Sequence, residues 1–195
     1  MNKTLMALFA AAGLCLAGAS TAQTTTPHDK AARDQAIKAA DSQYKADKDS
    51  CKSLSGNAKD ICMQEAKGKE KVAKADARAQ YDATPKAREN ARLARAEATY
   101  DVAKEKCDDV TGNQKDVCVK EAKAQYTKAK ADAKVDRVAA DTSRNAVQKT
   151  ADAKKDAAED KRDADYKVAV EKCDALAGNA KDACVRDAKA KHGKS

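Results

Sequence analysis

The sequence has few of the residues that build a conventional globular core. It contains no Trp and a single Phe, Phe9, and only 16 of residues 23–195 are Leu, Ile or Val. That share, about 9%, lies far below the roughly 20% under which a chain is suspected of disorder. A core of large apolar side chains is therefore excluded, and any fold must be held together in another way.

The residues that most catalytic and metal sites require are scarce as well. The only His residues, His28 and His192, lie near the two ends of the chain. There is no nucleophile elbow, no Gly-rich phosphate loop and no H-E-x-x-H motif. We therefore expect no enzymatic activity, no metal site and no cofactor.

The N-terminal segment has the three-part layout of a secretory signal peptide. Lys3 precedes an apolar run over residues 5–17, and small residues lead to a cleavage site after Ala22. The apolar run is too short and too rich in Ala to be a good membrane span. We expect residues 1–22 to be removed, together with Cys15, and the remaining chain to be exported.

What the chain does contain is charge, in nearly balanced amounts. Without Lys3, 38 basic and 31 acidic side chains leave a net charge of about +7. Acids interrupt every basic run and stacking aromatics are almost absent, so a nucleic-acid partner is not expected. Ala, Lys, Glu, Gln and Arg favour helix. Acids that precede bases by four residues add support within a helix: Asp41/Lys45, Glu65/Lys69, Glu70/Lys74, Asp116/Lys120 and Asp182/Arg186.

Six cysteines remain after residue 22, and they form three segments of identical spacing. The segments are CKSLSGNAKDIC, CDDVTGNQKDVC and CDALAGNAKDAC, at offsets of 56 and 66 residues. Each has Gly-Asn at its centre: Gly56 and Asn57, Gly112 and Asn113, Gly178 and Asn179. A left-handed Gly ends one helix and Asn caps the next. Each copy is therefore predicted to be a helix, a tight turn and a second helix.

The cysteines of one copy lie at equal distances from the turn. In an antiparallel hairpin such positions face each other, so we predict the disulfides Cys51–Cys62, Cys107–Cys118 and Cys173–Cys184. A soft metal ion held by the thiols and thiol exchange are the alternatives. The spacing is not that of a metal knuckle, and no C-x-x-C motif is present.

The first helix of each copy carries a narrow apolar seam. Tyr44, Tyr100 and Tyr166 each lie seven residues before a cysteine, and we expect them to pack against the partner helix. A binding stripe is the alternative for these tyrosines. In the third copy the seam fades, because Glu159 and Arg162 stand where Leu93 and Ala96 stand in the second.

These features predict an all-α protein of three disulfide-stapled antiparallel hairpins that form an elongated bundle or a rod. The hairpins are expected within residues 23–84, 85–141 and 142–195, with Thr84-Pro85 as one helix end and restart. No Gly or Pro lies between Asn113 and Ala177. That segment is either one rod of nearly 100 Å or a helix pair broken near Thr142.

Two segments, KEKVAKADARAQ (residues 69–80) and KAQYTKAKADAKVDR (residues 123–137), resemble the helical middle region of TolA, the envelope-bridging protein of Gram-negative bacteria. The Cys hairpins with GN-x-KD resemble those of small exported TolA-like proteins of such bacteria. The resemblance implies a periplasmic location and an envelope-associated, non-enzymatic role.

We therefore expect a periplasmic helical scaffold or interaction protein of the cell envelope. Its partner would be an envelope protein, or a cell-wall or anionic lipid surface, and the sequence leaves the oligomeric state open. One alternative is a stress-protective hydrophilic protein that shields membranes or proteins and gains helix on contact with them. The other is a periplasmic metal or thiol buffer, which requires reduced cysteines.

Overall fold

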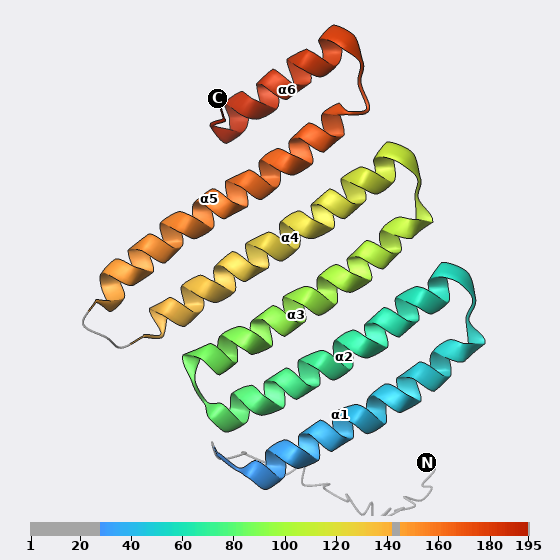
Figure 1. The fold of residues 1–195 in the computed structure, drawn as a ribbon, viewed down its shortest axis with the longest axis vertical. Helices are drawn as coiled ribbons and strands as arrows, with labels where there is room; N and C mark the ends of the chain where they lie inside the picture. The colour runs from blue at the N-terminus through green and yellow to red at the C-terminus, as the bar shows by residue number, and fades with distance from the viewer. Residues whose placement is uncertain (1–27, 142–144, 195) are drawn as a thin grey trace, which may run out of the picture.

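A computed structural model describes residues 28–141 and 145–194, and the described part is helical with short connections (Figure 1). The predicted signal peptide, residues 1–22, and the expected break at Thr142 lie outside the described residues. The α-helices are α1 (Lys30–Ser50), α2 (Gly56–Asp82), α3 (Pro85–Lys106), α4 (Gly112–Ala139), α5 (Ala146–Cys173) and α6 (Gly178–His192). Short 3-10 turns, Cys51–Ser53 and Cys107–Asp109, follow α1 and α3.

The six helices lie side by side in a single layer (Figure 1). Extensive contacts within the described part join only helices that are neighbours in sequence, from α1·α2 through to α5·α6. Consecutive helices run antiparallel, and the three Gly-Asn turns lie at the same end of the layer. The all-α fold of three stapled hairpins is therefore confirmed.

The long segment without Gly or Pro is two helices rather than one rod. α4 ends at Ala139 and α5 begins at Ala146, and each is 28 residues long. The two helices pack against each other along their length. Of the two arrangements that the sequence allowed, the chain adopts the folded one.

Alanine and half of the paired cysteines form the interior. Every buried apolar residue in the described part is Ala or Cys, and Cys51, Cys107 and Cys173 are the largest side chains that are fully buried. Such short side chains let helix axes approach closely. One close approach is at Gly68 in α2, where an added Cβ would lie 2.9 Å from Cβ of Ala98 in α3.

The connection between the first two hairpins follows the predicted pattern. Ala83 ends α2 in the left-handed conformation, with φ of 52°. Thr84 is the N-cap of α3, and its hydroxyl accepts a hydrogen bond of 3.1 Å from the backbone N–H of Ala87. Pro85 is the first residue of α3, where its missing N–H has no cost. The predicted helix end and restart are confirmed.

The third hairpin is asymmetric, and this explains its weak apolar seam. α6 has 15 residues against 28 in α5, and it ends at His192 with Gly193 in the left-handed conformation. α6 therefore covers only the part of α5 nearest the turn (Figure 1). Glu159 and Arg162 lie on the remaining part and are exposed. The polar residues of the seam stand beyond the end of α6, on the part of α5 that α6 does not cover.

Candidate functional site

Each hairpin is closed by the predicted disulfide. Cys51–Cys62, Cys107–Cys118 and Cys173–Cys184 are bonded, with Cα–Cα distances of 5.7, 5.6 and 5.7 Å. The first cysteine of each pair is at most 1% exposed, whereas the second is half-buried. Three stapled pairs with no free thiol in the described part indicate an oxidising, extracytoplasmic compartment.

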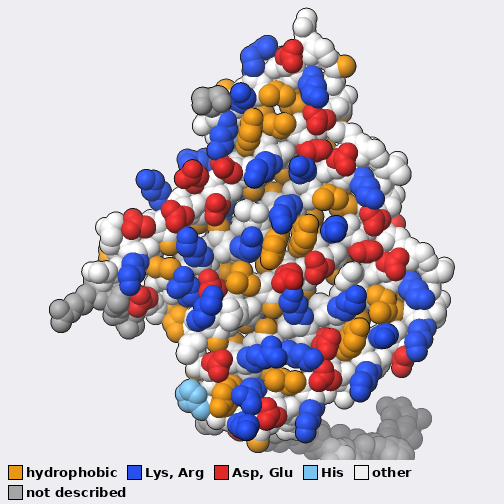
Figure 2. Space-filling model, viewed as in Figure 1, with side chains coloured by type: hydrophobic (Ala, Val, Ile, Leu, Met, Phe, Trp, Pro, Cys, Tyr) orange, Lys and Arg blue, Asp and Glu red, His pale blue; other side chains and the backbone are white. Residues whose placement is uncertain are grey.

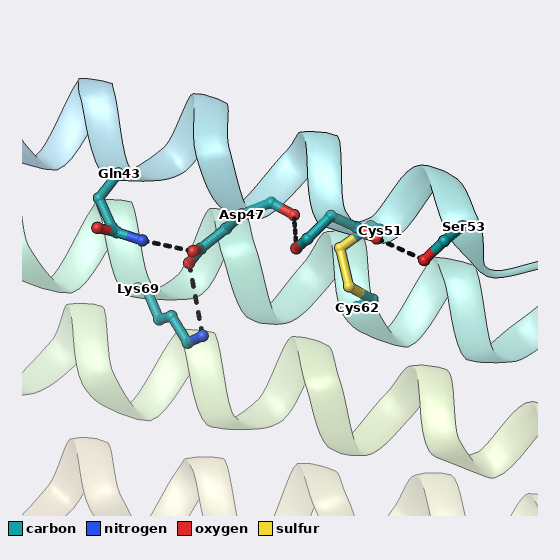
Figure 3. The surroundings of a disulfide bond; sticks show 7 residues. Gln43, Asp47, Cys51, Ser53, Cys62 and Lys69 are labelled. Carbon is teal, nitrogen blue, oxygen red and sulfur yellow. Dashed lines mark hydrogen bonds and ion pairs between the residues drawn. A yellow bond between two sulfur atoms is a disulfide. The ribbon is translucent and has the colours of Figure 1, made fainter.

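Polar contacts support the first staple from both helices (Figure 3). The carboxylate of Asp47 in α1 accepts a hydrogen bond of 2.6 Å from the Gln43 amide and one of 3.5 Å from Lys69 in α2. The hydroxyl of Ser53 donates to the backbone carbonyl of Ser50 at 2.9 Å. The staple therefore sits beside a second, ionic link between the two helices.

The turn glycines are required by conformation. Gly56, Gly112 and Gly178 have φ of 54°, 57° and 54°, in the left-handed region that L side chains rarely adopt. The space around each is open, since no heavy atom lies within 4 Å of where a Cβ would be. The predicted left-handed conformation is therefore confirmed. The prediction that each Gly ends the preceding helix is wrong, because each is the first residue of the helix that follows the turn.

The predicted role of the turn asparagines as helix caps is wrong. The N-cap residues are Ser55, Thr111 and Ala177, so each Asn lies inside the helix that follows the turn. Instead, the Asn57 amide donates to the Glu105 carbonyl at 3.1 Å and to the Asp109 carboxylate at 2.7 Å, both in the second hairpin. Asn113 likewise donates to the Glu171 carbonyl of the third hairpin at 3.1 Å. These asparagines join hairpins to one another.

Charged side chains connect neighbouring helices more than they support single ones. Of the five predicted pairs within a helix, only Glu70–Lys74, at 2.7 Å, is an ion pair of the described residues. Ion pairs instead cross each helix boundary from α1 to α5: Lys74–Asp41 at 2.5 Å, Arg95–Asp76 at 2.7 Å, Arg137–Glu89 at 3.0 Å and Lys134–Asp156 at 3.0 Å. Figure 2 shows the resulting surface, in which both signs of charge are interspersed with hydrophobic side chains.

Glu89 in α3 is the one buried charged residue of the described part, at 7% exposed. Burial disfavours its charged form, but ion pairs with Lys86 at 2.6 Å and with Arg137 of α4 at 3.0 Å outweigh burial, so the pKa of Glu89 lies below its ordinary value. The sequence did not single out Glu89. Only its position between α3 and α4 distinguishes it from the many exposed acids.

Two of the three seam tyrosines make ring contacts with the partner helix of their own hairpin. Tyr100 stacks on Tyr126 of α4, with ring centroids 5.2 Å apart, and Lys123 lies 5.3 Å from the Tyr100 ring. Tyr166 contacts the ring of His192 in α6 at 6.3 Å. Packing against the partner helix is therefore confirmed for Tyr100 and Tyr166, and Tyr44 is half-buried in α1.

An apolar groove follows the boundary between the first and second hairpins. It has a volume of about 730 Å³, and Gly68 and Val72 of α2 line it together with Ala98 and Val102 of α3. Charged residues flank it, with Glu65 and Asp76 on one side and Arg95 and Lys106 on the other. A groove of about 610 Å³ is lined by Ala124 of α4 and Val168 of α5, together with Ala103 of α3 and Cys107.

The described residues contain no cluster of three or more His, Cys, Asp or Glu side chains that could hold a metal ion. None of the helices from α1 to α6 is long and apolar enough to cross a membrane. The features that recur from hairpin to hairpin are instead the staples, the turn residues and the charged surface.

These features define an array of disulfide-stapled helical hairpins, packed in series. No family model matches the chain, and neither the curated proteins nor the solved structures include a match to it. The functional argument therefore rests on this chain's own residues and geometry.

Proposed function

We propose that this protein is a non-enzymatic scaffold or interaction protein of the periplasmic cell envelope. The observation that carries the proposal is the single layer of helices, which leaves two broad faces exposed to possible partners. Most domains bury a helix face between two packed layers. Here disulfide staples and ion pairs hold the helices together. Helix faces that other domains bury in a core therefore stay exposed.

The compartment and the class of partner have separate support. Disulfides indicate an oxidising compartment, and the signal-like segment at residues 1–22 favours export to the periplasm. A net charge of about +7 favours attraction to anionic lipid or cell-wall polymer, or to an acidic envelope protein.

The first test is the thiol state of the protein taken from the periplasm. Alkylation before and after reduction, followed by mass-spectrometric mapping, should show three disulfides within hairpins. Recovery in the cytoplasmic fraction would contradict the proposed location. Free or metal-protected thiols in periplasmic protein would instead favour the metal or thiol buffer.

A second test separates the scaffold from a stress-protective protein. Circular dichroism in dilute buffer should show a chain that is already helical and that gains little helix with anionic vesicles. Sedimentation with cell-wall sacculi or anionic vesicles, against zwitterionic vesicles as the control, should show binding that weakens with salt. Low helicity in buffer with a large gain on vesicles would overturn the scaffold in favour of the protective role.

A further inference from the structure

The contact between hairpins occurs twice in this chain with the same components. Asn57 donates to the carbonyl of Glu105, and Asn113 donates to the carbonyl of Glu171, both at 3.1 Å. Each acceptor lies two residues before the first cysteine of the next hairpin. One hydrogen bond therefore repeats at α2·α3 and at α4·α5.

Charges and small residues repeat along with this hydrogen bond. Glu65 pairs with Lys106 at 3.9 Å, and its counterpart Glu121 pairs with Lys172 at 2.5 Å. Gly68 meets Ala98 at the first boundary, and the corresponding residues of the second boundary are Ala124 and Ala164, both buried. The joint between hairpins is thus a defined module of the fold.

The third hairpin has the donor half of this joint on α6, and no described helix packs against it. Asn179, Asp187 and Ala190 correspond to Asn57, Glu65 and Gly68, and all three are exposed. Extensive contacts of α6 are made with α5 alone, and the Asn179 side chain has no hydrogen bond to the described residues. The edge of α6 therefore repeats an interface that is occupied elsewhere in the chain.

The acceptor half of the joint is exposed at the opposite edge, on α1. Ser42, Ala46 and Asp49 correspond to Ala98, Val102 and Glu105, and all three are exposed. Extensive contacts of α1 with another α-helix of the described part are with α2 alone. The carbonyl of Asp49 thus occupies the position that Asn57 and Asn113 recognise in the other two hairpins.

The lengths of the two edges also match. Gln35 and Lys38 of α1 replace the buried Ala91 and Ala94 of α3, and these polar residues would disfavour a full-length helix. If α6 repeats the contact of Gly68 with Ala98, Ala190 faces Ser42 of a second copy. α6 ends two residues later, at His192. Gln35 and Lys38 lie beyond the end of α6, so they leave the short contact undisturbed.

We propose that α6 of one copy docks on α1 of a second copy, head to tail, and reproduces the hydrogen bond and the small-residue contact of the joint between hairpins. Ser50 stands where Lys106 and Lys172 stand in the joint, so their ion pairs with Glu65 and Glu121 are not repeated. The Asn179 amide donates to the Asp49 carbonyl of the next copy. Arg186, which corresponds to Lys120, pairs with the Asp49 carboxylate as Lys120 pairs with Glu171 at 3.4 Å. Such a heterologous contact joins subunits into open chains, or into a ring where the rotation between copies closes. This inference stands independently of the proposed function.

The test blocks each edge separately. Ser42→Lys charges the α1 edge and Ala190→Lys charges the α6 edge, and both positions are exposed in the single chain. Sedimentation of protein purified from exporting cells should show wild-type association between about 10 μM and about 1 mM, at the weak end of the affinity scale. Each variant should stay monomeric. Their equimolar mixture should form dimers and nothing larger, because one intact edge of each kind remains.

A matched pair of asparagine variants tests the hydrogen bond itself. Asn179→Ala should weaken association about fivefold, the effect of one hydrogen bond, without lowering the melting temperature. Asn57→Ala, the same change inside the chain, should lower the melting temperature and leave association unchanged. Circular dichroism of every variant confirms that it is folded.

Three outcomes would overturn the proposal. Wild-type protein that is still monomeric at about 1 mM has no such joint, since even weak specific interfaces associate at that concentration. Association of either lysine variant to the wild-type extent shows that another surface is used. A mixture of the two variants that stays monomeric, while wild type associates, shows a contact that is not head to tail.

Discussion

Small side chains set the distances between the helices of this protein. Gly68 brings α2 against Ala98 of α3, and in the next pair of hairpins Ala124 and Ala164 take these places. A methyl group bonded directly to the backbone cannot move aside as the end of a long side chain can. The spacing of α2 and α3 therefore depends on the absence of a single Cβ.

Gly68→Ala is expected to destabilise the protein although it improves helix propensity. The added Cβ would lie 2.9 Å from Cβ of Ala98, which is too close for both helices to stay in place. Overpacking costs about 1–3 kcal/mol and the gain in propensity is about 1 kcal/mol, so a net loss of about 1 kcal/mol should appear in urea unfolding. Adding Ala98→Gly should restore stability, whereas a more stable single variant would contradict the close approach.

Glu89 should give part of the protein's stability a dependence on acid pH. Its pKa in the folded state is lowered, so protonation favours the unfolded chain. Its contribution is present above the unfolded pKa of about 4.3 and is lost as the pH falls through the folded pKa. Glu89→Gln should lower stability at pH 7 by about 1–3 kcal/mol and flatten this acid-side loss.

Glu97, whose side chain is 42% exposed and pairs with Lys71, supplies the control for this prediction. Glu97→Gln should change urea unfolding at pH 7 by less than about 1 kcal/mol, as expected of a surface pair. Equal effects of the two substitutions would show that burial of Glu89 contributes nothing.

At the scale of the element, the unit of this protein is a hairpin with one staple. The staple joins cysteines 11 residues apart around a Gly in the left-handed conformation. In the first and second hairpins the two stapled helices also pack extensively on each other, α1 on α2 and α3 on α4. In the third hairpin α6 is short and packs extensively only on α5. The same staple therefore matters differently in different hairpins.

Removing the staples one pair at a time should reveal this difference. Replacing Cys107 and Cys118 by Ser should lower the free energy of unfolding by about 2–3 kcal/mol, the loop-closure effect. Replacing Cys173 and Cys184 should instead release α6 locally, because little else holds it. Limited trypsin digestion should then cut at Lys181 and Arg186 while α1 to α4 remain protected. Equal protection of α6 in both variants would contradict a local release.

At the scale of the whole molecule, the layer is one helix thick. Helices of about 28 residues are about 40 Å long, and five spacings of 8–10 Å separate six of them. A flat object of this size has a radius of gyration of about 20 Å, compared with about 15 Å for a compact domain of the same length. The shape is thus measurable as well as visible in Figure 1.

Small-angle X-ray scattering extrapolated to zero concentration should give the larger radius, about 20 Å. The extrapolation removes the association between copies proposed above. The Ser42→Lys variant, measured in parallel, should give the same value with a weaker dependence on concentration. A radius near that of a compact domain would mean that the helices close into a bundle in solution.

The symmetric placement of cysteines around Gly-Asn, with helix-forming residues on either side, was enough to predict the hairpins and their three disulfides. These depend on residues that are close in sequence, since bonded cysteines are 11 residues apart. Thr84-Pro85 predicted a helix boundary for the same reason. The roles of Asn57, Asn113 and Glu89 were missed, because their partners in neighbouring helices lie 48 to 58 residues away.

The sequence by itself determined the stapled helical hairpins of this protein, since local spacing and intrinsic propensity act within one hairpin. It left open whether α4 and α5 are one rod or two helices. Only the tertiary structure decided that the hairpins pack in series as one layer, joined by Asn57 and Asn113 and by ion pairs between helices. The physical reason is that Ala-rich faces and mixed charges permit many helix packings of similar energy. Which one forms depends on polar contacts between hairpins, and these are apparent only once the hairpins lie side by side.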